Sequence, residues 1–268
     1  MKKFVIIMIL SQVIAFSFAV NSENDFTYKL SDDAESVIIT GFKKDLSTYD
    51  IPDLIEEMPV SAIDIEEYRD QYNDSNGKKE EVVLKLPEGL KELRLLIRVS
   101  GNRKRHFIIN NLPSSLEKCK IDSFSPVPGK YSVTVKGSLK KLDKLTSFVA
   151  NDVEFEDKIL TVRKKWSYYN FRGSDFTEVD FEEGCEIIGS FQYCENLKKV
   201  TLPSSVKEFY YDGTFEGCIN LREFIIPDTA TGFDLSRKPY MVFDRVPLPL
   251  KVQAKLKKLG YRGEFGNP

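Results

Sequence analysis

The sequence predicts a β-rich solenoid, in which short strand-containing units stack along one axis. A pattern that starts Phe-x-x-Cys-x-x-Leu and ends at a proline fills residues 191–203 and returns in residues 215–227, with every paired position 24 residues apart. Looser Leu-x-x-Leu-x-Leu patterns precede it, and the chain has 19 Phe and 12 Tyr, aromatic residues that suit strands. Since one such unit cannot cover its own apolar side, a fixed period of this length indicates that neighbours share a continuous core.

Residues 1–19 have the features of a secretory signal. Lys2 and Lys3 precede an apolar run, and the small residues Ser17 and Ala19 stand at the −3 and −1 positions of a cleavage site. The alternative is an uncleaved membrane anchor, but the run is short for a span of roughly 20 residues and contains polar residues such as Gln12. We expect cleavage after Ala19, an exported mature chain and no transmembrane segment after cleavage.

The charge of the chain argues against one class of partner. There are 39 Lys and Arg against 41 Asp and Glu, which gives a formal net charge of −2, and the two signs are mixed along the sequence. A mildly acidic, charge-mixed surface is not typical of a protein that binds nucleic acid. We therefore expect no nucleic acid partner.

Residues 20–70 are predicted to cap one end of the stack. Apolar and polar residues alternate in residues 26–30, a polar turn follows, and a second strand-like run fills residues 37–42, which together indicate a β-hairpin. A solenoid needs its open core covered at each end, and a hairpin can do this. Residues 49–63 should form a first, irregular coil, and the polar segment 71–81 should be an exposed loop because it contains an Asn-Gly turn signal.

Residues 82–227 hold the repeats. Three loose copies occupy residues 86–95, 112–121 and 136–145, and the regular units begin at Phe176. The uneven spacing of the loose copies predicts connecting loops of different length.

Residues 228–268 are predicted to cap the second end. Residues 228–248 break the pattern, and residues 249–259 follow as a short helix with Gly260 as its C-terminal cap. The apolar residues of this helix, which would close the solenoid, are Leu250, Val252, Leu256 and Leu259.

The four cysteines of an exported chain suggest disulfides, but their positions within the repeat argue against a disulfide framework. Cys194 and Cys218 hold the same position in consecutive units, and Cys119 stands where the pattern has an aliphatic residue. Cys185 falls where Val206 falls in the next unit. All four are therefore interpreted as small buried hydrophobic residues. A bond between Cys194 and Cys218 is the alternative, because stacked neighbours lie about 4.8 Å apart.

The pattern FxxCxxLxxVxLPxSVxxF resembles the BspA-like, or treponemal, class of leucine-rich repeats. The resemblance is strongest over residues 176–227 and extends more loosely over residues 82–148, and the N-terminal hairpin resembles the openings of such proteins. It implies a curved, right-handed leucine-rich-repeat arc with short strands on its concave face, on a bacterial surface or in the periplasm. It also implies adhesion to host matrix proteins, attachment to other bacteria or protein recognition. A likeness of fold does not by itself fix function.

Residues that could carry catalysis are scarce. His106 is the only histidine, and a Ser/His/Asp or Cys/His mechanism would need it as the base, yet no motif places a nucleophile beside it. We interpret it as an exposed loop histidine. The sequence has neither a CxxC-type ligand spacing nor a glycine-rich phosphate loop. We expect no enzyme activity, no cofactor and no metal site.

Strand residues that alternate with the buried positions are one candidate binding surface. Stacking should place them in two columns, one of Glu178, Lys199 and Glu223 and the other of Asp180, Thr201 and Ile225. Because the first column alternates in sign, neighbouring strands would attract each other by about 0.2–1 kcal/mol per pair. The alternative is a solvated face that only keeps the stack soluble.

Aromatic residues are the second candidate surface, made of Trp166, Tyr168, Tyr169, Tyr210 and Tyr211. The two stretches that contain them each precede the Phe of the next unit, so we expect them on the same side of the stack. Exposed Trp and Tyr beside Lys and Arg suit a protein-binding hot spot. Strand alternation should bury about half of these aromatic side chains.

The leading hypothesis is an exported leucine-rich-repeat protein for protein recognition or adhesion at the bacterial envelope, found in the periplasm, at the cell surface or secreted. Its partner would be a host matrix protein or an envelope protein. The alternative is a carrier that binds a small hydrophobic molecule or lipid in a concave apolar pocket. A pocket lined by Trp166 and the tyrosines would favour the carrier, and titratable groups converging on His106 would favour an enzyme.

Overall fold

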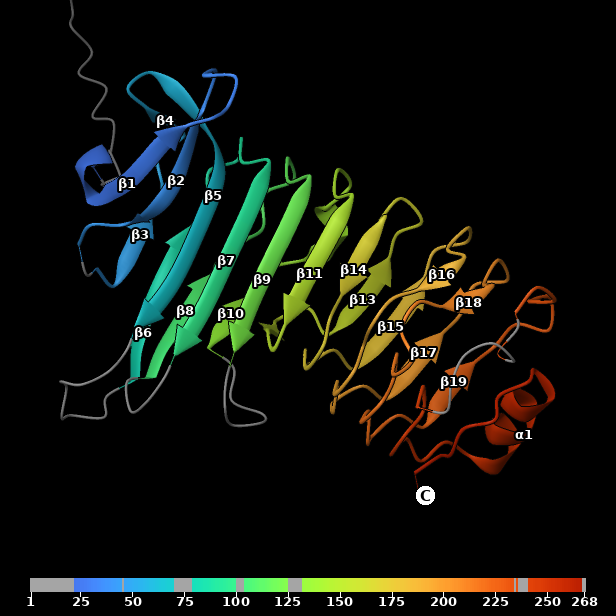
Figure 1. The fold of residues 1–268 in the computed structure, drawn as a ribbon. Coiled ribbons are helices and arrows are strands. Elements are labelled where there is room, and N and C mark those ends of the chain that lie inside the picture. Colours follow the sequence, from blue (N-terminus) through green and yellow to red (C-terminus); the bar gives the residue numbers. More distant parts are fainter. Residues whose placement is uncertain are drawn as a thin grey trace, which may run out of the picture.

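The computed structural model describes residues 22–44, 46–69, 79–99, 104–124, 132–233, 235 and 241–266. Within these residues the molecule is elongated and rich in strands, with one α-helix close to the C-terminus (Figure 1). The strands of the N-terminal half are β1 (Phe26–Leu30), β2 (Val37–Phe42), β3 (Thr48–Asp50), β4 (Leu54–Ile55), β5 (Met58–Arg69), β6 (Lys79–Lys85), β7 (Glu92–Val99), β8 (Lys104–Ile109), β9 (Lys118–Phe124) and β10 (Val133–Val135). Those that follow are β11 (Ser147–Asn151), β12 (Glu154–Phe155), β13 (Ile159–Val162), β14 (Tyr168–Asn170), β15 (Glu178–Phe181), β16 (Ile187–Ile188), β17 (Lys199–Thr201), β18 (Glu208–Phe209) and β19 (Glu223–Ile225). The helix is α1 (Leu250–Lys258), and short 3-10 turns cover Glu23–Asp25 and Leu139–Lys141.

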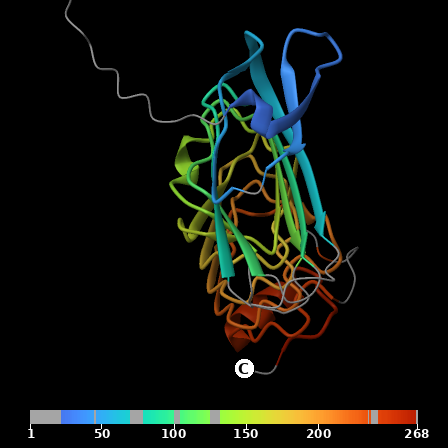
Figure 2. The ribbon, with the colours of Figure 1, turned by 90° about the vertical axis from the view of Figure 1, so that its left-hand side faces the viewer.

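The chain alternates between two sheets in its first half. One sheet has the order β1-β2-β5-β7-β9-β11-β14, with β4 paired to β5, and the other has the order β12-β10-β8-β6-β3. From β2 to β14 the neighbouring strands in the first sheet are parallel, and so are those of the second. Each passage of the chain therefore adds one strand to each sheet. Figure 2, which looks along the molecule from its N-terminal end, shows two walls of strands.

Two smaller parallel sheets continue the arrangement towards the C-terminus. They have the orders β13-β15-β17-β19 and β16-β18. A parallel bridge between Asn170 and Ser190 joins the end of β14 to the residues that follow β16. A strand-rich structure with parallel sheets is consistent with the expected leucine-rich-repeat type of fold.

The predicted N-terminal hairpin is present. β1 and β2 pair antiparallel with Leu30 opposite Val37, and the backbone N–H of Ser31 closes the turn by donating to Ser36 O at 2.9 Å. The buried residues of the pair, Phe26, Val37 and Ile39, face the end of the core. β2 then pairs parallel with β5, which joins the hairpin to the first sheet.

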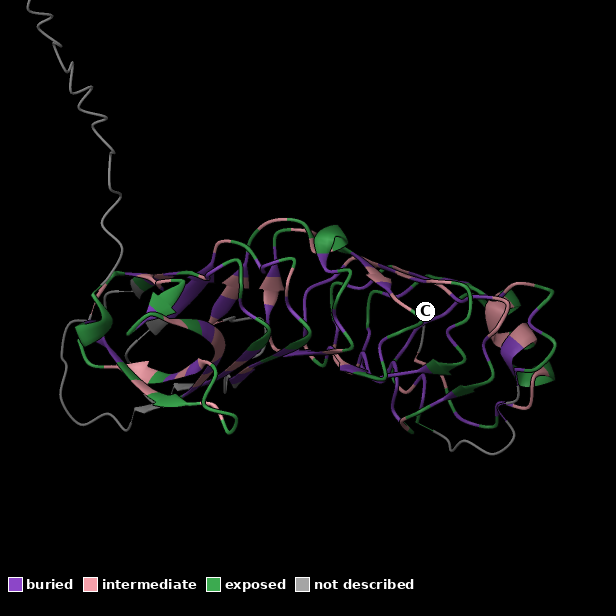
Figure 3. Ribbon diagram, turned by 90° about the horizontal axis from the view of Figure 1, so that it is seen from above, coloured by how far each residue is buried: buried purple, intermediate pink, exposed green. Residues whose placement is uncertain are grey.

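Stacked phenylalanine rings form the centre of the C-terminal half. The rings of Phe171, Phe191, Phe215, Phe243 and Phe265 succeed one another at centroid separations of 5.5, 5.7, 5.9 and 5.9 Å, with interplanar angles of 27°, 8°, 9° and 27°. Each aromatic pair contributes about 0.5–1.5 kcal/mol beyond the area that it buries. Figure 3 shows buried residues along the length of the molecule and exposed ones largely in the connecting segments.

Backbone hydrogen bonds keep these phenylalanines in phase. The N–H of Phe171 donates to Ser190 O at 2.9 Å, and the N–H of Phe191 donates to Thr214 O at 2.8 Å. The N–H of Phe215 donates to Val242 O at 3.0 Å, so the same phase returns at Phe243, 28 residues after Phe215. The sequence pattern breaks after residue 227 because a longer connection is inserted, yet the hydrogen-bonded column continues past that break.

The cysteine positions satisfy a backbone carbonyl of the preceding unit. The Cys194 thiol donates to Phe171 O at 3.0 Å, and the Cys218 thiol donates to Phe191 O at 3.1 Å. Ser174, which holds the same phase one unit earlier, donates its hydroxyl to Ala150 O at 2.7 Å. All four cysteines are free and buried, which confirms their interpretation as core residues and leaves Cys194 and Cys218 unbonded in the structure.

The residue two positions after each of Phe171, Phe191, Phe215 and Phe243 has a left-handed backbone. These residues are Gly173 (φ 69°), Tyr193 (φ 57°), Gly217 (φ 71°) and Arg245 (φ 59°). Such a conformation is strained for any residue except glycine. A Cβ atom on Gly217 would lie 2.5 Å from Tyr193 Cδ1, so glycine also makes room for the tyrosine ring of the preceding unit. That ring lies under two cations, with the Arg172 and Arg245 Cζ atoms 5.0 and 5.5 Å from its centroid.

Two local predictions differ from the structure. β6 begins at Lys79, inside the segment 71–81 that was expected to be a loop, because Lys79–Glu81 pair with β8; residues 70–78 lie outside the described residues. The predicted helix is present as α1, with Gly260 at φ 93° after its end. Of its predicted apolar face, Leu256 is buried, but Leu250 is 76% exposed because it is the first residue of the helix.

Replacement of Phe215 by alanine tests the stacked phenylalanine rings. Phe215 is fully buried between Phe191 and Phe243, so Phe215→Ala should lower the free energy of unfolding by about 3–5 kcal/mol in a urea titration followed by far-UV circular dichroism. Ile219→Ala is the control, since Ile219 is exposed and its loss should cost less than about 0.5 kcal/mol. Equal decreases in the free energy of unfolding of the two variants would contradict a stabilising role for the stacked phenylalanine rings.

A pair of variants at Cys194 tests the thiol–carbonyl bond. Cys194→Ser keeps a donor for Phe171 O, as Ser174 does for Ala150 O, whereas Cys194→Ala removes it. The serine variant should therefore be more stable than the alanine variant by about 1 kcal/mol in the same urea titration. An alanine variant as stable as the serine variant would show that the carbonyl needs no donor at this position.

Candidate functional site

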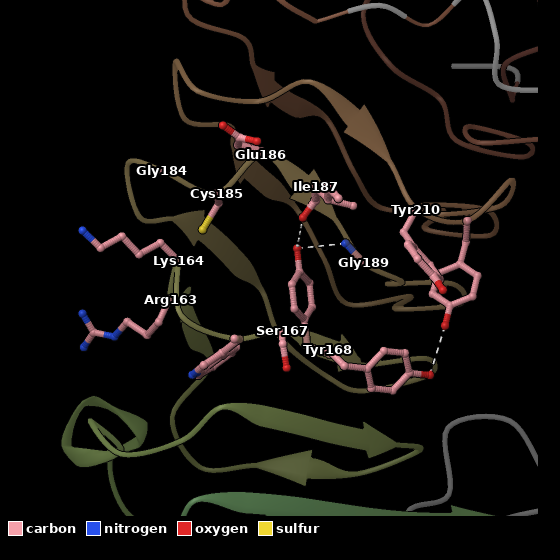
Figure 4. Close-up of a pocket in the computed structure, with 13 residues that line it drawn as sticks. Arg163, Lys164, Ser167, Tyr168, Gly184, Cys185, Glu186, Ile187, Gly189 and Tyr210 are labelled. Atoms are coloured by element: carbon pink, nitrogen blue, oxygen red, sulfur yellow. Dashed lines mark hydrogen bonds between the residues drawn. The ribbon is translucent and has the colours of Figure 1, made fainter.

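A pocket of about 360 Å³ lies where β14, β16 and the segment after β18 meet (Figure 4). It is near the lower end of ordinary ligand pockets, which span roughly 300–1,000 Å³. Its lining includes all five aromatic residues of the second candidate surface: Trp166, Tyr168, Tyr169, Tyr210 and Tyr211. The structure thus brings together two stretches that are about 40 residues apart in the sequence and places them on the same side, as expected.

Tyr169 is the fixed inner residue of the pocket. Its side chain is buried, and its hydroxyl donates to Ile187 O at 2.9 Å and accepts from the Gly189 N–H at 2.8 Å (Figure 4). Burial raises the pKa of Tyr169, so the hydroxyl stays protonated and keeps its donor role. Gly189 is required for this contact, because a Cβ atom there would lie 2.7 Å from Tyr169 Cε2 and 2.6 Å from Tyr169 O.

Three tyrosines line the outer part of the pocket. The hydroxyls of Tyr168 and Tyr211 share a hydrogen bond of 3.0 Å, and the ring of Tyr210 meets that of Tyr211 edge-on at 4.6 Å between centroids. Burial and the Tyr168 hydroxyl raise the pKa of Tyr211 to about 12. Tyr168 is 43% exposed and Tyr210 is 56% exposed, so both offer ring surface to a partner, while the hydroxyl bond to Tyr211 limits the freedom of Tyr168 and the ring contact with Tyr211 limits that of Tyr210.

Trp166 is mainly a core residue that reaches the pocket wall. It is 7% exposed, and its ring packs against Phe148 at 5.5 Å and Tyr169 at 6.2 Å between centroids. The indole N–H is buried and has no hydrogen-bond partner in the described part of the chain. Of the five predicted aromatic residues, Trp166 and Tyr169 are therefore buried and Tyr168 and Tyr210 are exposed, which agrees with the expected division.

The other end of the pocket is basic. Arg163 and Lys164 line it, and their side chains extend on the side away from Tyr168 and Tyr210 (Figure 4). Glu186 also lines the pocket, but its carboxylate is paired with Lys207 Nζ at 2.8 Å. Glu182 accepts a hydrogen bond from the backbone N–H of Lys164 at 2.9 Å. Neither Arg163 nor Lys164 forms a side-chain ion pair with a carboxylate among the described residues.

A second hollow of about 350 Å³ lies on the outer face of β7, β9, β11 and β14, and Tyr168 lines both hollows. Outward-facing residues of four neighbouring strands line it in register, with Glu92 beside Lys118 and Arg94 beside Lys120. Lys118 Nζ is paired with Glu92 at 2.7 Å, and Arg94 is paired with Asp64. The two hollows are separate but adjoin each other at Tyr168, the residue that lines both.

The predicted strand columns occur in the expected register but on another sheet. Glu178 lies opposite Lys199 and Lys199 opposite Glu223, and in the second column Asp180, Thr201 and Ile225 are neighbours. The Lys199–Glu178 distance of 3.3 Å shows the expected attraction, and that hydrogen bond raises the pKa of Lys199. These six residues belong to β15, β17 and β19, and none of them lines the aromatic pocket. Their role in binding stays a prediction.

The interpretation of His106 as an exposed loop residue is wrong. It lies in β8 and is 7% exposed, because β8 runs from Lys104 between β6 and β10. His106 Nε2 lies 2.8 Å from Thr134 Oγ1, which donates its proton to Glu154 Oε2 at 2.8 Å. Since the threonine hydroxyl has a single proton, it accepts from His106, which therefore does not serve as its base. No group of three potential metal-ligating side chains occurs among the residues that the structure describes.

Several residues of the site are not singled out by the sequence. Ile187 and Gly189 look like ordinary repeat positions, and Arg163 and Lys164 look like a solvated turn. The usable signal is the short Ile188-Gly189-Ser190-Phe191 connection, which brings Gly189 against the ring of Tyr169.

Replacement of Gly189 by alanine tests the close contact at the base of the pocket. The added Cβ should displace the Tyr169 ring, lower the free energy of unfolding by about 1–3 kcal/mol and change the emission of Trp166, the single tryptophan of the chain. Gly89→Ala is the matched control, since a Cβ there meets no atom within 4 Å. An unchanged emission spectrum in Gly189→Ala would contradict this packing.

Comparison with known proteins gives one family match. Residues 164–236 match the BspA type leucine rich repeat region, in 6 copies. A leucine-rich repeat protein of T. pallidum with a known crystal structure is 17% identical, with a TM-score of 0.36, and the alignment covers 93% of this chain and 100% of that chain. No curated protein matches the chain. Residues 164–236 of this chain are thus a BspA-type leucine-rich repeat region.

Proposed function

We propose that this chain is an exported leucine-rich-repeat protein that recognises another protein at the bacterial envelope, as an adhesin or a recognition protein in the periplasm, at the cell surface or outside the cell. A BspA-type repeat region indicates protein–protein interaction as the class of function, since stacked repeats present extended binding surfaces. Proteins with such repeats are typically binding proteins without enzyme activity. A host matrix protein or an envelope protein is the proposed partner.

The proposal includes a division of the chain. Residues 1–19 would be a signal peptide, and they lie outside the described residues. Residues 20–70 would cap one end of a right-handed solenoid, residues 82–227 would form its repeats, and residues 228–268 with α1 would cap the other end. Among the described residues, no helix has the length and apolar character needed to cross a membrane.

The observation that carries the proposal is the exposed tyrosine rim of the pocket. Tyr168 and Tyr210 expose about half of their surface, yet the Tyr168–Tyr211 hydroxyl bond holds the rim in place before a partner arrives. Aromatic side chains that are exposed and already ordered lose little conformational freedom on binding. They therefore suit the centre of a protein interface.

The pocket also supports a second candidate function. A cavity of about 360 Å³ lined by Trp166, Tyr169 and Ile187 could enclose part of a small hydrophobic molecule or lipid. The second hollow favours the protein partner, because it adjoins the pocket at Tyr168 and extends the candidate surface beyond the size of a small ligand. A lipid carrier would need a deeper, enclosed apolar cavity.

Alanine variants of the rim test the proposed function. The double variant Tyr168→Ala/Tyr210→Ala should reduce capture of the partner at least about tenfold, because aromatic anchors of this kind contribute about 2 kcal/mol or more. Its melting temperature should be unchanged, since both side chains are exposed. The measurement is a saturable pull-down of the purified chain against host matrix proteins and envelope extracts, with surface protease accessibility of intact cells.

The variant Glu223→Ala/Ile225→Ala is the control for that experiment. Both residues are exposed on β19 and neither lines the pocket, so capture should be unaffected. A fall in melting temperature of the tyrosine variant would show that the rim belongs to the core. Absence of any saturable protein partner would refute protein recognition.

A further inference from the structure

We propose that the pocket and the adjoining hollow bind an acidic, extended peptide segment of the partner, with one apolar side chain in the pocket and carboxylates on its basic edge. This inference rests on the proposed function and adds the chemistry of the partner. It is carried by three features of the surface: an aromatic cavity of side-chain size, cations beside it that lack ion-pair partners among the described residues, and a second hollow that adjoins the cavity at Tyr168 and crosses neighbouring strands.

The cavity suits an apolar side chain. Its inner surface is formed by the buried ring of Tyr169, the edge of Trp166 and the half-exposed side chain of Ile187. The Tyr169 hydroxyl at this surface is already bonded to both Ile187 O and the Gly189 N–H, and the indole N–H of Trp166 is buried without a hydrogen-bond partner among the described residues. Most of the surface is ring and aliphatic carbon, against which an apolar side chain would be buried favourably.

The basic edge selects the charge of the segment. Arg163 and Lys164 line the pocket without a side-chain ion pair among the described residues, while Glu186 on the same wall is neutralised by Lys207. The pocket lining has Arg163 and Lys164 against the single carboxylate of Glu186, with the Glu182 carboxylate close by on the Lys164 backbone N–H, whereas the chain as a whole has a formal net charge of −2. A partner carboxylate on Arg163 or Lys164 would supply the missing counter-charge.

The second hollow favours a peptide over a compact ligand. It adjoins the pocket at Tyr168 and crosses β7, β9, β11 and β14, which at about 4.8 Å per strand gives about 14 Å, or roughly four extended residues. Arg94 and Lys118 in this hollow are paired with Asp64 and Glu92, whereas Lys120 has no ion pair within the described part of the chain. Asp122 is a carboxylate of the same hollow and would disfavour an acidic residue directly above it.

Trp166 gives a direct readout of occupancy, because it is the single tryptophan of the chain and lines the pocket. Short synthetic peptides made of Glu and Gly with one central Phe should change its emission saturably when they are titrated into the purified chain. The matched peptides carry Lys in place of every Glu, or Ala in place of Phe. Both should bind at least about tenfold more weakly, since one loses the charge match and the other the buried side chain.

Charge variants locate the basic edge. The double variant Arg163→Gln/Lys164→Gln should lower the affinity for the acidic peptide by about three- to tenfold. It should also make that affinity less dependent on salt between about 0.05 and 0.5 M. Lys257→Gln/Lys258→Gln on α1 makes the same change of net charge at exposed residues that line neither hollow, and should leave the affinity unchanged. An equal effect of the two double variants would overturn the assignment of the basic edge.

The outcomes separate this inference from the proposed function. Equal binding of the Glu and Lys peptides, or tight binding of an uncharged fatty alcohol instead, would overturn the proposal of an acidic peptide. If a captured protein partner depends on Tyr168 and Tyr210 but not on Arg163 and Lys164, protein recognition stands and the acidic chemistry is wrong. If neither a protein partner nor the acidic peptide binds, both proposals fail.

Discussion

The parallel register between successive units is the constraint on which this structure depends. A unit of about two dozen residues has too little apolar surface to fold alone, so each must bury its inner side chains against the next. Register decides which side chains these are, and it is held by bonds such as Phe191 N–H to Thr214 O and by the stacked rings of Phe191 and Phe215. The same register explains the small donors at Cys194 and Cys218, since each satisfies a carbonyl of the preceding unit.

The candidate site lies where neighbouring repeat units differ from one another in sequence and in the length of their connections. The short connection to Gly189 lets the ring of Tyr169 fill space that a longer loop would occupy, and tyrosines follow β18 where a turn needs only polar residues. The tyrosines after β18 leave the inner positions undisturbed, because Phe209 beside them stays buried, whereas Tyr169 and Gly189 are themselves buried and pack on each other. A repeat protein can in this way vary its recognition surface while the register that stabilises it is kept.

The position of each residue within its strand or repeat unit accounts for most of what the sequence could predict. The hairpin, the strand columns from Glu178 to Ile225, the buried cysteines and α1 all follow from alternation or period. The predictions that were wrong or incomplete depend on residues that are neighbours only in space. His106 is buried because β8 lies between β6 and β10 in its sheet. The stacked phenylalanine rings continue at Phe243, after an insertion that hides the repeat period in the sequence. The aromatic residues were predicted to share a side of the stack, but the pocket depends on the packing of Tyr169 on Gly189, for which the short connection before Phe191 is the signal in the sequence.

The central claim is that recognition uses the surface of the aromatic pocket rather than the strand columns of β15, β17 and β19. Hydroxyl-radical footprinting of the chain, free and in complex with the protein that it captures, tests this at the level of side chains. The account predicts strong protection of Tyr168, Tyr210 and Tyr211 in the complex, with unchanged labelling of Ile225. Protection of Ile225 with unchanged tyrosines would contradict it.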